Sequence, residues 1–120
     1  MTSETKAMLQ KRAKPQLCRG FVARFPRAIE AVARVSEFGA NKHEVEMGDM
    51  SYLYTPGAEV LYLEAELRHM VAEVTEGECD PESMLLHKAH KAWDAMADLE
   101  KAIQILSAEA KAREYEETIT

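Results

Sequence analysis

The stretch that decides the fold is GAEVLYLEAELRHMVAEVTEG, residues 57–77. Apolar side chains recur in it every three or four residues, the spacing of one face of an α-helix. This apolar stripe consists of Val60, Leu63, Leu67, Met70 and Val74. A polar stripe runs beside it with the same spacing and consists of Glu59, Tyr62, Glu66, His69, Glu73 and Glu76. The pattern predicts a helix from about residue 57 to residue 76, ended by Gly77.

Two further helices are predicted on either side of this one. The first begins at Pro26 with PRAIEAVARVSEF and stops at Gly39, because proline suits a first helical turn and glycine a helix end. Residues 40–56 form a long connection. The last helix starts with Asp80 as its cap and Pro81 in its first turn, and it extends to about residue 115. Its expected core face consists of Leu86, Ala89, Trp93, Met96 and Ile103.

Length and composition favour an all-α domain. The chain has 120 residues, of which 47% are hydrophobic and only 7% aromatic, a mixture that favours helices over strands. We predict one domain over residues 1–120, with three main helices, a short N-terminal helix near Lys6–Arg12, and flexible segments at 1–13 and 110–120. A small helical bundle of this kind often completes its core by pairing, so we expect a homo-oligomer.

Charge and motifs exclude several classes of function. The net charge of −6 argues against a surface for a nucleic-acid polymer, which needs a basic stripe. No apolar run approaches the roughly 20 residues that span a membrane, and no secretory signal opens the chain, so we expect a cytoplasmic protein. Phosphate-binding glycine loops, paired CxxC motifs and a G-x-S-x-G elbow are all absent from the sequence. The two cysteines lack ligand spacing and are expected to be reduced thiols.

Histidines and carboxylates recur on matching helix faces. Glu66 and His69 form an E-x-x-H pair, and His87 and His90 form an H-x-x-H pair. If the two helices pack antiparallel through their apolar stripes, the pairs face each other and can build a metal site. Glu30 and Glu37 of the first helix, which lie on a shared face, could complete its shell. Two alternatives stay open: a non-catalytic helical interaction module, and a bundle that stores or senses metal.

Four segments together resemble a known family. They are KPQL (14–17), AIEAVARVSEFGANKH (28–43), ELRH (66–69) and GECDPESMLLHKAH (77–90). In order and spacing they are similar to the phage dATP/dGTP diphosphohydrolases of the MazZ type, over about residues 14–98. The resemblance implies a MazG-like, all-α nucleotide pyrophosphohydrolase that binds a divalent metal and forms a dimer or tetramer. It also implies hydrolysis of dGTP and dATP to monophosphates, which supplies dGMP for 2-aminoadenine synthesis and depletes dATP in the infected host cytoplasm.

The resemblance also implies roles for particular residues. Carboxylates suit Mg²⁺ or Mn²⁺, and nearby imidazoles make Co²⁺ a further candidate. The expected metal ligands are Glu30, Glu37, Glu66 and Asp80; the expected phosphate-binding residues are Lys42, Arg68 and His90; and the expected proton-transferring residues are His69 and His87. The chain departs from the family pattern at His43 and in EVEMGDMSYLYT, which leaves the choice between dGTP and dATP open. The products, either a monophosphate with pyrophosphate or a diphosphate with phosphate, also stay open.

Overall fold

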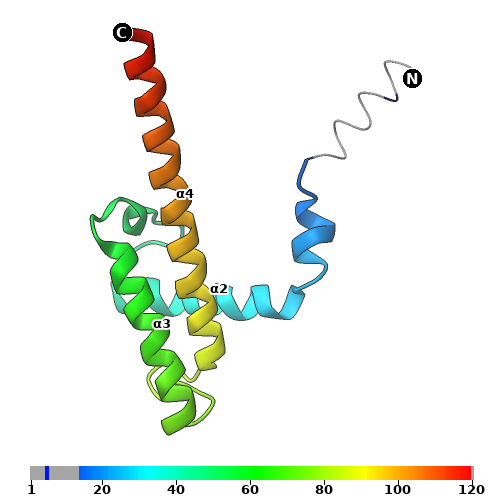
Figure 1. The fold of residues 1–120 in the computed structure, drawn as a ribbon. Helices are drawn as coiled ribbons and strands as arrows, with labels where there is room; N and C mark the ends of the chain where they lie inside the picture. Colours follow the sequence, from blue (N-terminus) through cyan, green and yellow to red (C-terminus); the bar gives the residue numbers. More distant parts are fainter. Residues whose placement is uncertain (1–4, 6–13, 120) are drawn as a thin grey trace. The chain divides into compact units, whose positions relative to one another are not determined.

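A computed structural model describes residue 5 and residues 14–119, and every element in that part of the chain is helical. The elements are the π-helical turn η1 (Cys18–Val22), α2 (Pro26–Lys42), the 3₁₀ helix η2 (Ser51–Tyr54), α3 (Ala58–Thr75) and α4 (His87–Ile119) (Figure 1). The prediction of an all-α fold is therefore confirmed. The helix expected near Lys6–Arg12 lies outside the described residues. Within residues 14–119 no helix combines the length and the apolar composition needed to cross a membrane.

The chain divides into two compact units, Met1–Glu30 and Ala31–Thr120. In the first unit, the rings of Phe21 and Phe25 lie 6.1 Å apart at the end of η1. The second unit contains most of α2 and all of η2, α3 and α4. One domain over residues 1–120 stays a prediction, and the candidate site described below lies entirely in the second unit.

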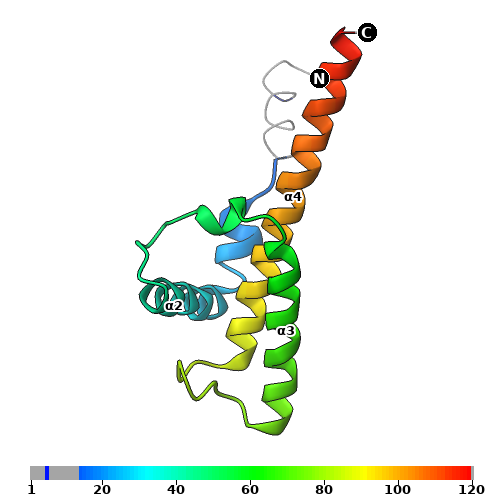
Figure 2. The same ribbon diagram turned by 90° about the vertical axis from the view of Figure 1, so that its left-hand side faces the viewer.

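Helices α3 and α4 lie side by side and run antiparallel (Figures 1 and 2). Their contact is made by polar stripes. Tyr62, Glu66 and His69 of α3 are half-buried, and His87, His90 and Asp94 of α4 are buried. Small side chains, Ala58, Ala89 and Ala97, are buried in the same unit and let the two backbones approach each other. The expectation that the apolar stripes would pack together is therefore wrong.

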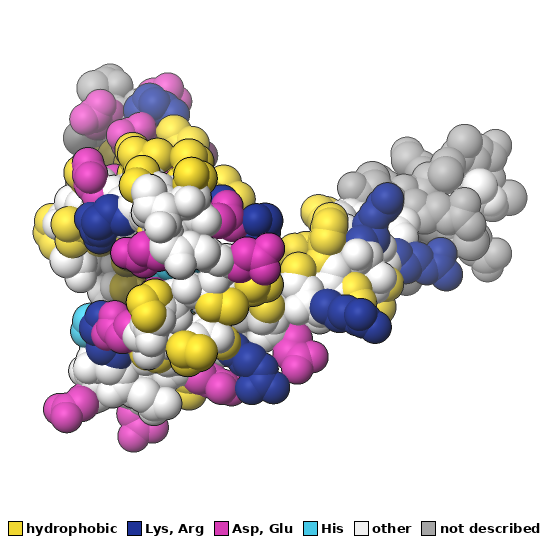
Figure 3. Space-filling view, turned by 90° about the horizontal axis from the view of Figure 1, so that it is seen from below, with side chains coloured by type: hydrophobic (Ala, Val, Ile, Leu, Met, Phe, Trp, Pro, Cys, Tyr) yellow, Lys and Arg dark blue, Asp and Glu magenta, His cyan; other side chains and the backbone are white. Residues whose placement is uncertain are grey.

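The apolar stripe of α3 is exposed instead. Its five members retain between 44% and 84% of their accessible surface: Val60 58%, Leu63 47%, Leu67 44%, Met70 47% and Val74 84%. Of the expected core face of α4, Ala89 is buried and Trp93 half-buried, whereas Leu86, Met96 and Ile103 are exposed. Figure 3 shows hydrophobic side chains on one face of the molecule, interspersed with acidic and basic ones. An exposed apolar surface of this extent is typical of an interaction site.

Two predicted helix ends also need correction. Helix α2 does not stop at Gly39 but continues to Lys42. Helix α4 begins at His87, seven residues after the expected cap at Asp80, and extends to Ile119. By contrast, the bounds of α3 agree with the prediction to within one residue at each end, and Gly57 takes the left-handed conformation (φ 75°) that begins it.

Residues 78–86 form a closed loop where a first helical turn was expected. An isolated bridge joins Cys79 to Leu86. The Asp80 N–H donates to the Leu85 carbonyl (2.8 Å), and the His87 N–H donates to the Glu78 carbonyl (2.9 Å). The Asp80 carboxylate accepts the Glu82 N–H at 2.8 Å, which is an Asx turn and not a helix cap. The aspartate thus shapes a loop that folds back on the start of α4.

Met84 closes this loop in a left-handed conformation, with φ 62°. A side chain with a Cβ atom is strained there by roughly 1 kcal/mol, and glycine is not. Met84 is 73% exposed, so little packing is lost on its removal. We expect Met84→Gly to raise the free energy of unfolding by up to about 1 kcal/mol in chemical denaturation. Met84→Ala, which keeps the Cβ, should show no such gain, and an equal gain in both variants would contradict this explanation.

Candidate functional site

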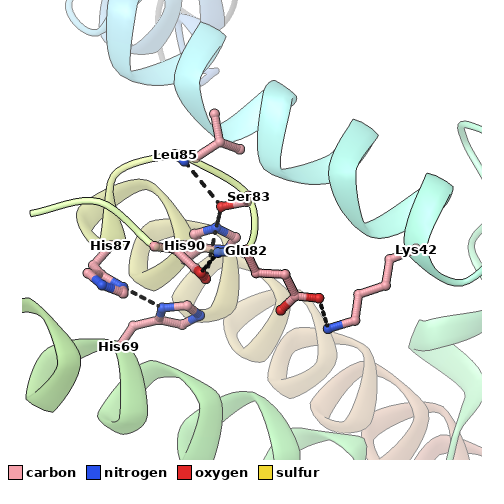
Figure 4. A network of polar contacts seen from close by, with 8 residues as sticks. Lys42, His69, Glu82, Ser83, Leu85, His87 and His90 are labelled. Atoms are coloured by element: carbon pink, nitrogen blue, oxygen red, sulfur yellow. Dashed lines mark hydrogen bonds and ion pairs between the residues drawn. The ribbon is translucent and has the colours of Figure 1, made fainter. Parts of the chain in front are cut away.

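Three histidines meet where the start of α4 faces α3 (Figure 4). The Nδ1 atoms of His69 and His87 lie 2.9 Å apart, so one ring donates a hydrogen bond to the other. The His69 ring also stacks on that of His90, with centroids 4.5 Å apart and an interplanar angle of 7°. His87 is only 2% exposed and His90 only 7%. Buried polar rings in mutual contact are costly for folding, which points to a role beyond packing.

The loop of residues 78–86 brings two more polar groups to His90. The Oδ2 atom of Asp80 lies 3.7 Å from His90 Nε2, and the Ser83 hydroxyl lies 2.7 Å from the same nitrogen. The Leu85 N–H donates to Ser83 Oγ at 3.2 Å, and the hydroxyl still has its proton and a second lone pair with which to bond His90. The short loop therefore holds a carboxylate and a hydroxyl against the buried imidazole.

His69, Asp80 and His90 together could hold a metal ion. Each offers one ligand atom, and these atoms all lie within 4.8 Å of one another. Ligands at about 2.0–2.2 Å from a tetrahedral metal are about 3.3–3.6 Å apart, so the side chains would close in by up to about 1.5 Å around an ion. Two imidazoles with one carboxylate are typical of sites for transition metals. The residues present thus fit a divalent metal in both spacing and chemistry.

Burial keeps the two candidate imidazole ligands neutral. It lowers the pKa of His69, and the neighbouring His90 lowers it further, while Asp80 opposes the shift. Burial likewise lowers the pKa of His90, again against the opposing charge of Asp80. A metal binds the neutral form of histidine. Both rings are therefore neutral near neutral pH, and a metal bound by His90 Nε2 would replace the hydrogen bond to Ser83.

His87 lies behind this group with one nitrogen unsatisfied. Its Nδ1 contacts His69, whereas its Nε2 is buried without a hydrogen-bond partner among the described residues. A buried polar atom without a partner costs about 1–3 kcal/mol. Polar groups behind metal ligands commonly orient those ligands through hydrogen bonds, and the position of His87 against His69 suits this task.

A buried carboxyl follows on the next turn of α4. Asp94 is 8% exposed, and burial raises its pKa to about 7, with a further contribution from the charge of Glu66 and an opposing one from Arg68. The pKa of Tyr62 is also raised, mainly by burial. Beyond the histidines, the interface between α3 and α4 therefore contains a carboxyl group, Asp94, that is partly protonated near pH 7.

A lysine lies at the rim of the histidine group. Lys42, the last residue of α2, pairs with Glu82 at 2.9 Å and lies 5.9 Å from the centre of the Phe38 ring. The Phe38 ring in turn meets His90 edge-on, with centroids 6.0 Å apart. Both partners of the ion pair are about half exposed, so the lysine can exchange Glu82 for another anion.

The structure brings together only some of the residues expected from the sequence. Those that converge are His69, His87, His90 and Asp80, with Lys42 at the rim. Arg68 is exposed on α3, but its charge acts on His69 and Asp94. Glu37 is exposed on α2 and Glu66 is half-buried one turn before His69; neither belongs to the ligand group found among the described residues. Glu30 belongs to the first unit, and its role stays a prediction.

Two residues of the site were given no role from the sequence. Asp94 shares the helical spacing of His87 and His90, four residues after His90. Ser83 has the same spacing relative to His87 and His90, but it reaches His90 from the loop and not from a helix. Its contact depends on how the loop folds back, which helical spacing does not reveal.

Comparison with known proteins gives one match. The sequence model of the family described as "dATP/dGTP diphosphohydrolase, N-terminal" matches residues 2–113. Searches of curated proteins and of solved structures found no match. The matched segment contains the whole histidine group, the loop that supplies Asp80, and Lys42. The chain therefore belongs to the family of dATP/dGTP diphosphohydrolase N-terminal domains, a family whose name points to hydrolysis of purine deoxynucleoside triphosphates.

Proposed function

We propose that this chain is a metal-dependent enzyme that hydrolyses dGTP and dATP to monophosphates, with the metal held by His69, Asp80 and His90. The observation that supports this most is the convergence of two imidazoles and a carboxylate within 4.8 Å of one another, in a chain whose family points to this substrate class. The two imidazoles favour Mn²⁺ or Co²⁺ over Mg²⁺. A phage role, supplying dGMP for 2-aminoadenine synthesis and removing dATP, is proposed on the sequence resemblance alone.

The protein's own residues have separate tasks in this proposal. A bound divalent metal neutralises phosphate charge and lowers the pKa of bound water. Lys42 releases Glu82 and binds a phosphate oxygen, and the exposed Arg68 offers a second cation near His69. His87 holds the ring of His69 in place through their 2.9 Å contact. These contacts allow an acidic protein to bind a highly charged anion at one place.

The proposal is tested by incubating the protein with each of the four deoxynucleoside triphosphates and Mg²⁺, Mn²⁺ or Co²⁺. Products are identified by anion-exchange chromatography. We expect dGMP or dAMP with pyrophosphate, with more turnover in Mn²⁺ or Co²⁺ than in Mg²⁺, and none in chelator. Release of a diphosphate with phosphate would contradict hydrolysis to the monophosphate. An absence of turnover with all three metals would contradict the enzyme itself and favour a non-catalytic interaction module.

We also propose that a second copy of this chain covers the exposed apolar stripe of α3. Five large apolar side chains on one helix face retain 44–84% of their surface, and their burial would contribute roughly 1–2 kcal/mol each. Small helical chains commonly bury such a face against an identical one.

Substitutions in the stripe should separate the copies. We expect Leu63→Lys together with Leu67→Lys to weaken self-association at least about 100-fold, because two buried apolar contacts are lost and two charges gained. Sedimentation velocity over a range of protein concentrations measures this. Glu46→Lys, exposed in the connection between α2 and η2, is the control. A wild-type chain that sediments as a monomer at every concentration would refute the assembly.

A further inference from the structure

A pocket of about 360 Å³ lies in the second unit, bounded by α2, η2 and α4. This volume falls within the range of small-molecule sites. Its walls are mostly apolar, with Val32, Met96 and Ile103 among them, and its polar groups come from Ser36, Tyr52, Trp93 and Glu100. None of these residues belongs to the histidine group, and the pocket has no part in the function proposed so far.

The aromatic wall of the pocket is held in place. The Trp93 indole N–H donates to Ser36 Oγ at 2.7 Å. The Trp93 ring lies 5.7 Å from that of Tyr52 and 5.9 Å from that of Tyr62. The Tyr62 hydroxyl donates to the Tyr52 carbonyl at 3.1 Å, which ties η2 to α3. The wall therefore keeps its shape without a ligand, which lowers the entropic cost of binding a flat ring.

The pocket lies close to the histidine group. Trp93 follows His90 by three residues on α4, which is about 4.5 Å along the helix axis. On α2, Ser36 of the pocket lies two residues before Phe38, whose ring contacts His90. A nucleotide with its phosphates at the histidines would therefore have its base within reach of Trp93.

We propose that this pocket binds the purine base of the substrate, stacked on Trp93 and Tyr52, with the Glu100 carboxylate selecting guanine. The inference rests on the function proposed above and adds its base selectivity. Aromatic side chains stack well on bases. Guanine presents two adjacent donors, N1–H and the 2-amino group, which match the two oxygens of a carboxylate. Adenine presents an acceptor at N1, so Glu100 disfavours it.

Trp93 reports directly on the pocket because it is the single tryptophan of the chain. The full chain, in chelator so that no hydrolysis occurs, is titrated with dGMP, dAMP and 2-deoxyribose 5-phosphate. Fluorescence is excited at the red edge and corrected with free tryptophan amide. We expect saturable quenching by dGMP, weaker binding of dAMP and no quenching by the sugar phosphate. Equal responses to all three ligands, or no response to dGMP, would overturn the proposal.

The selectivity is tested with Glu100→Gln, which keeps the size of the side chain but replaces one acceptor by a donor. We expect dGMP binding to weaken about tenfold while dAMP binding changes less than about twofold. Glu109→Gln, exposed on the same helix outside the pocket, should bind both nucleotides as the wild type does. Unchanged dGMP binding in Glu100→Gln would overturn the role of Glu100.

Kinetics separate this proposal from the catalytic one. If the chain hydrolyses both nucleotides, Glu100→Gln should lower the ratio of kcat/KM for dGTP over dATP about tenfold. If the chain hydrolyses both nucleotides, but the kcat/KM ratio is unchanged in Glu100→Gln and dGMP does not quench Trp93, base binding in the pocket is refuted and the proposed enzymatic activity is not. Selective quenching without turnover under any metal supports the pocket and refutes the enzyme. Trp93 fluorescence that responds to protein concentration but not to nucleotides would show that a second copy covers the pocket, and would refute base binding.

Discussion

Replacing His90 with glutamine should lower kcat/KM for dGTP by at least about 100-fold, because a proposed metal ligand and the contacts around it are lost together. His90 is the residue on which the site converges. Its ring stacks on His69, and its Nε2 faces both Ser83 and Asp80. Glutamine is close to histidine in length but is a poor ligand for a transition metal. Steady-state hydrolysis at several Mn²⁺ concentrations measures the loss, and high metal should restore only part of it.

The matched control for this substitution is His43→Gln. His43 is exposed and lies just beyond α2, so its loss should leave kcat/KM within about twofold of the wild-type value. Circular dichroism and gel filtration check that both variants are folded. Full activity in a folded His90→Gln variant would rule out His90 as a ligand.

Replacing Asp94 with asparagine should raise the free energy of unfolding at pH 8 by roughly 2–4 kcal/mol. Burial raises the pKa of this carboxyl from 3.8 to about 7 in the folded chain. Between these values the folded state holds a proton that the unfolded state has lost. The free energy of unfolding of the wild type therefore falls as the pH rises from about 4 to about 7, and the cost is fully present above that range.

Asparagine removes this dependence because it has no charge to bury. We would measure the free energy of unfolding in urea at pH 4.5, 6 and 8. The difference between the variant and the wild type should be small at pH 4.5 and should increase in favour of the variant as the pH rises. Glu109→Gln, exposed on the same helix, serves as the control, since an exposed carboxylate loses little solvation on folding. A variant less stable than the wild type at pH 8 would mean that the Asp94 charge is satisfied in the folded protein.

Helix α3 could be predicted closely from the sequence because its signals are local. Helical spacing fixes the element, and Gly57 and Gly77 flank it. The start of α4 could not be predicted in the same way. Asp80 followed by proline is an equally good opening for a helix and for an Asx turn. The choice is made by hydrogen bonds between the two arms of the loop, from Asp80 to Leu85 and from His87 to Glu78.

The sequence also could not predict which face of α3 packs against α4. Two stripes with the same spacing lie side by side, and burial of the apolar one is the usual outcome. Here the polar stripe faces α4 and is half-buried except at Glu76, and α4 offers it matching partners. His69 contacts His87, and Glu73 binds both Lys88 and Lys91. The grouping of the three histidines could be predicted from their faces, whereas the contribution of Ser83 required the folded loop.

The central claim, that His69, Asp80 and His90 hold the metal on which hydrolysis depends, is tested most directly by locating the ion. Crystals grown with Mn²⁺ and a non-hydrolysable dGTP analogue would be measured for anomalous scattering at the manganese edge. We expect a peak about 2.0–2.3 Å from one ring nitrogen each of His69 and His90 and from the Asp80 carboxylate. A peak bound instead by Glu37 or Glu66, with the histidine group free of metal, would contradict it.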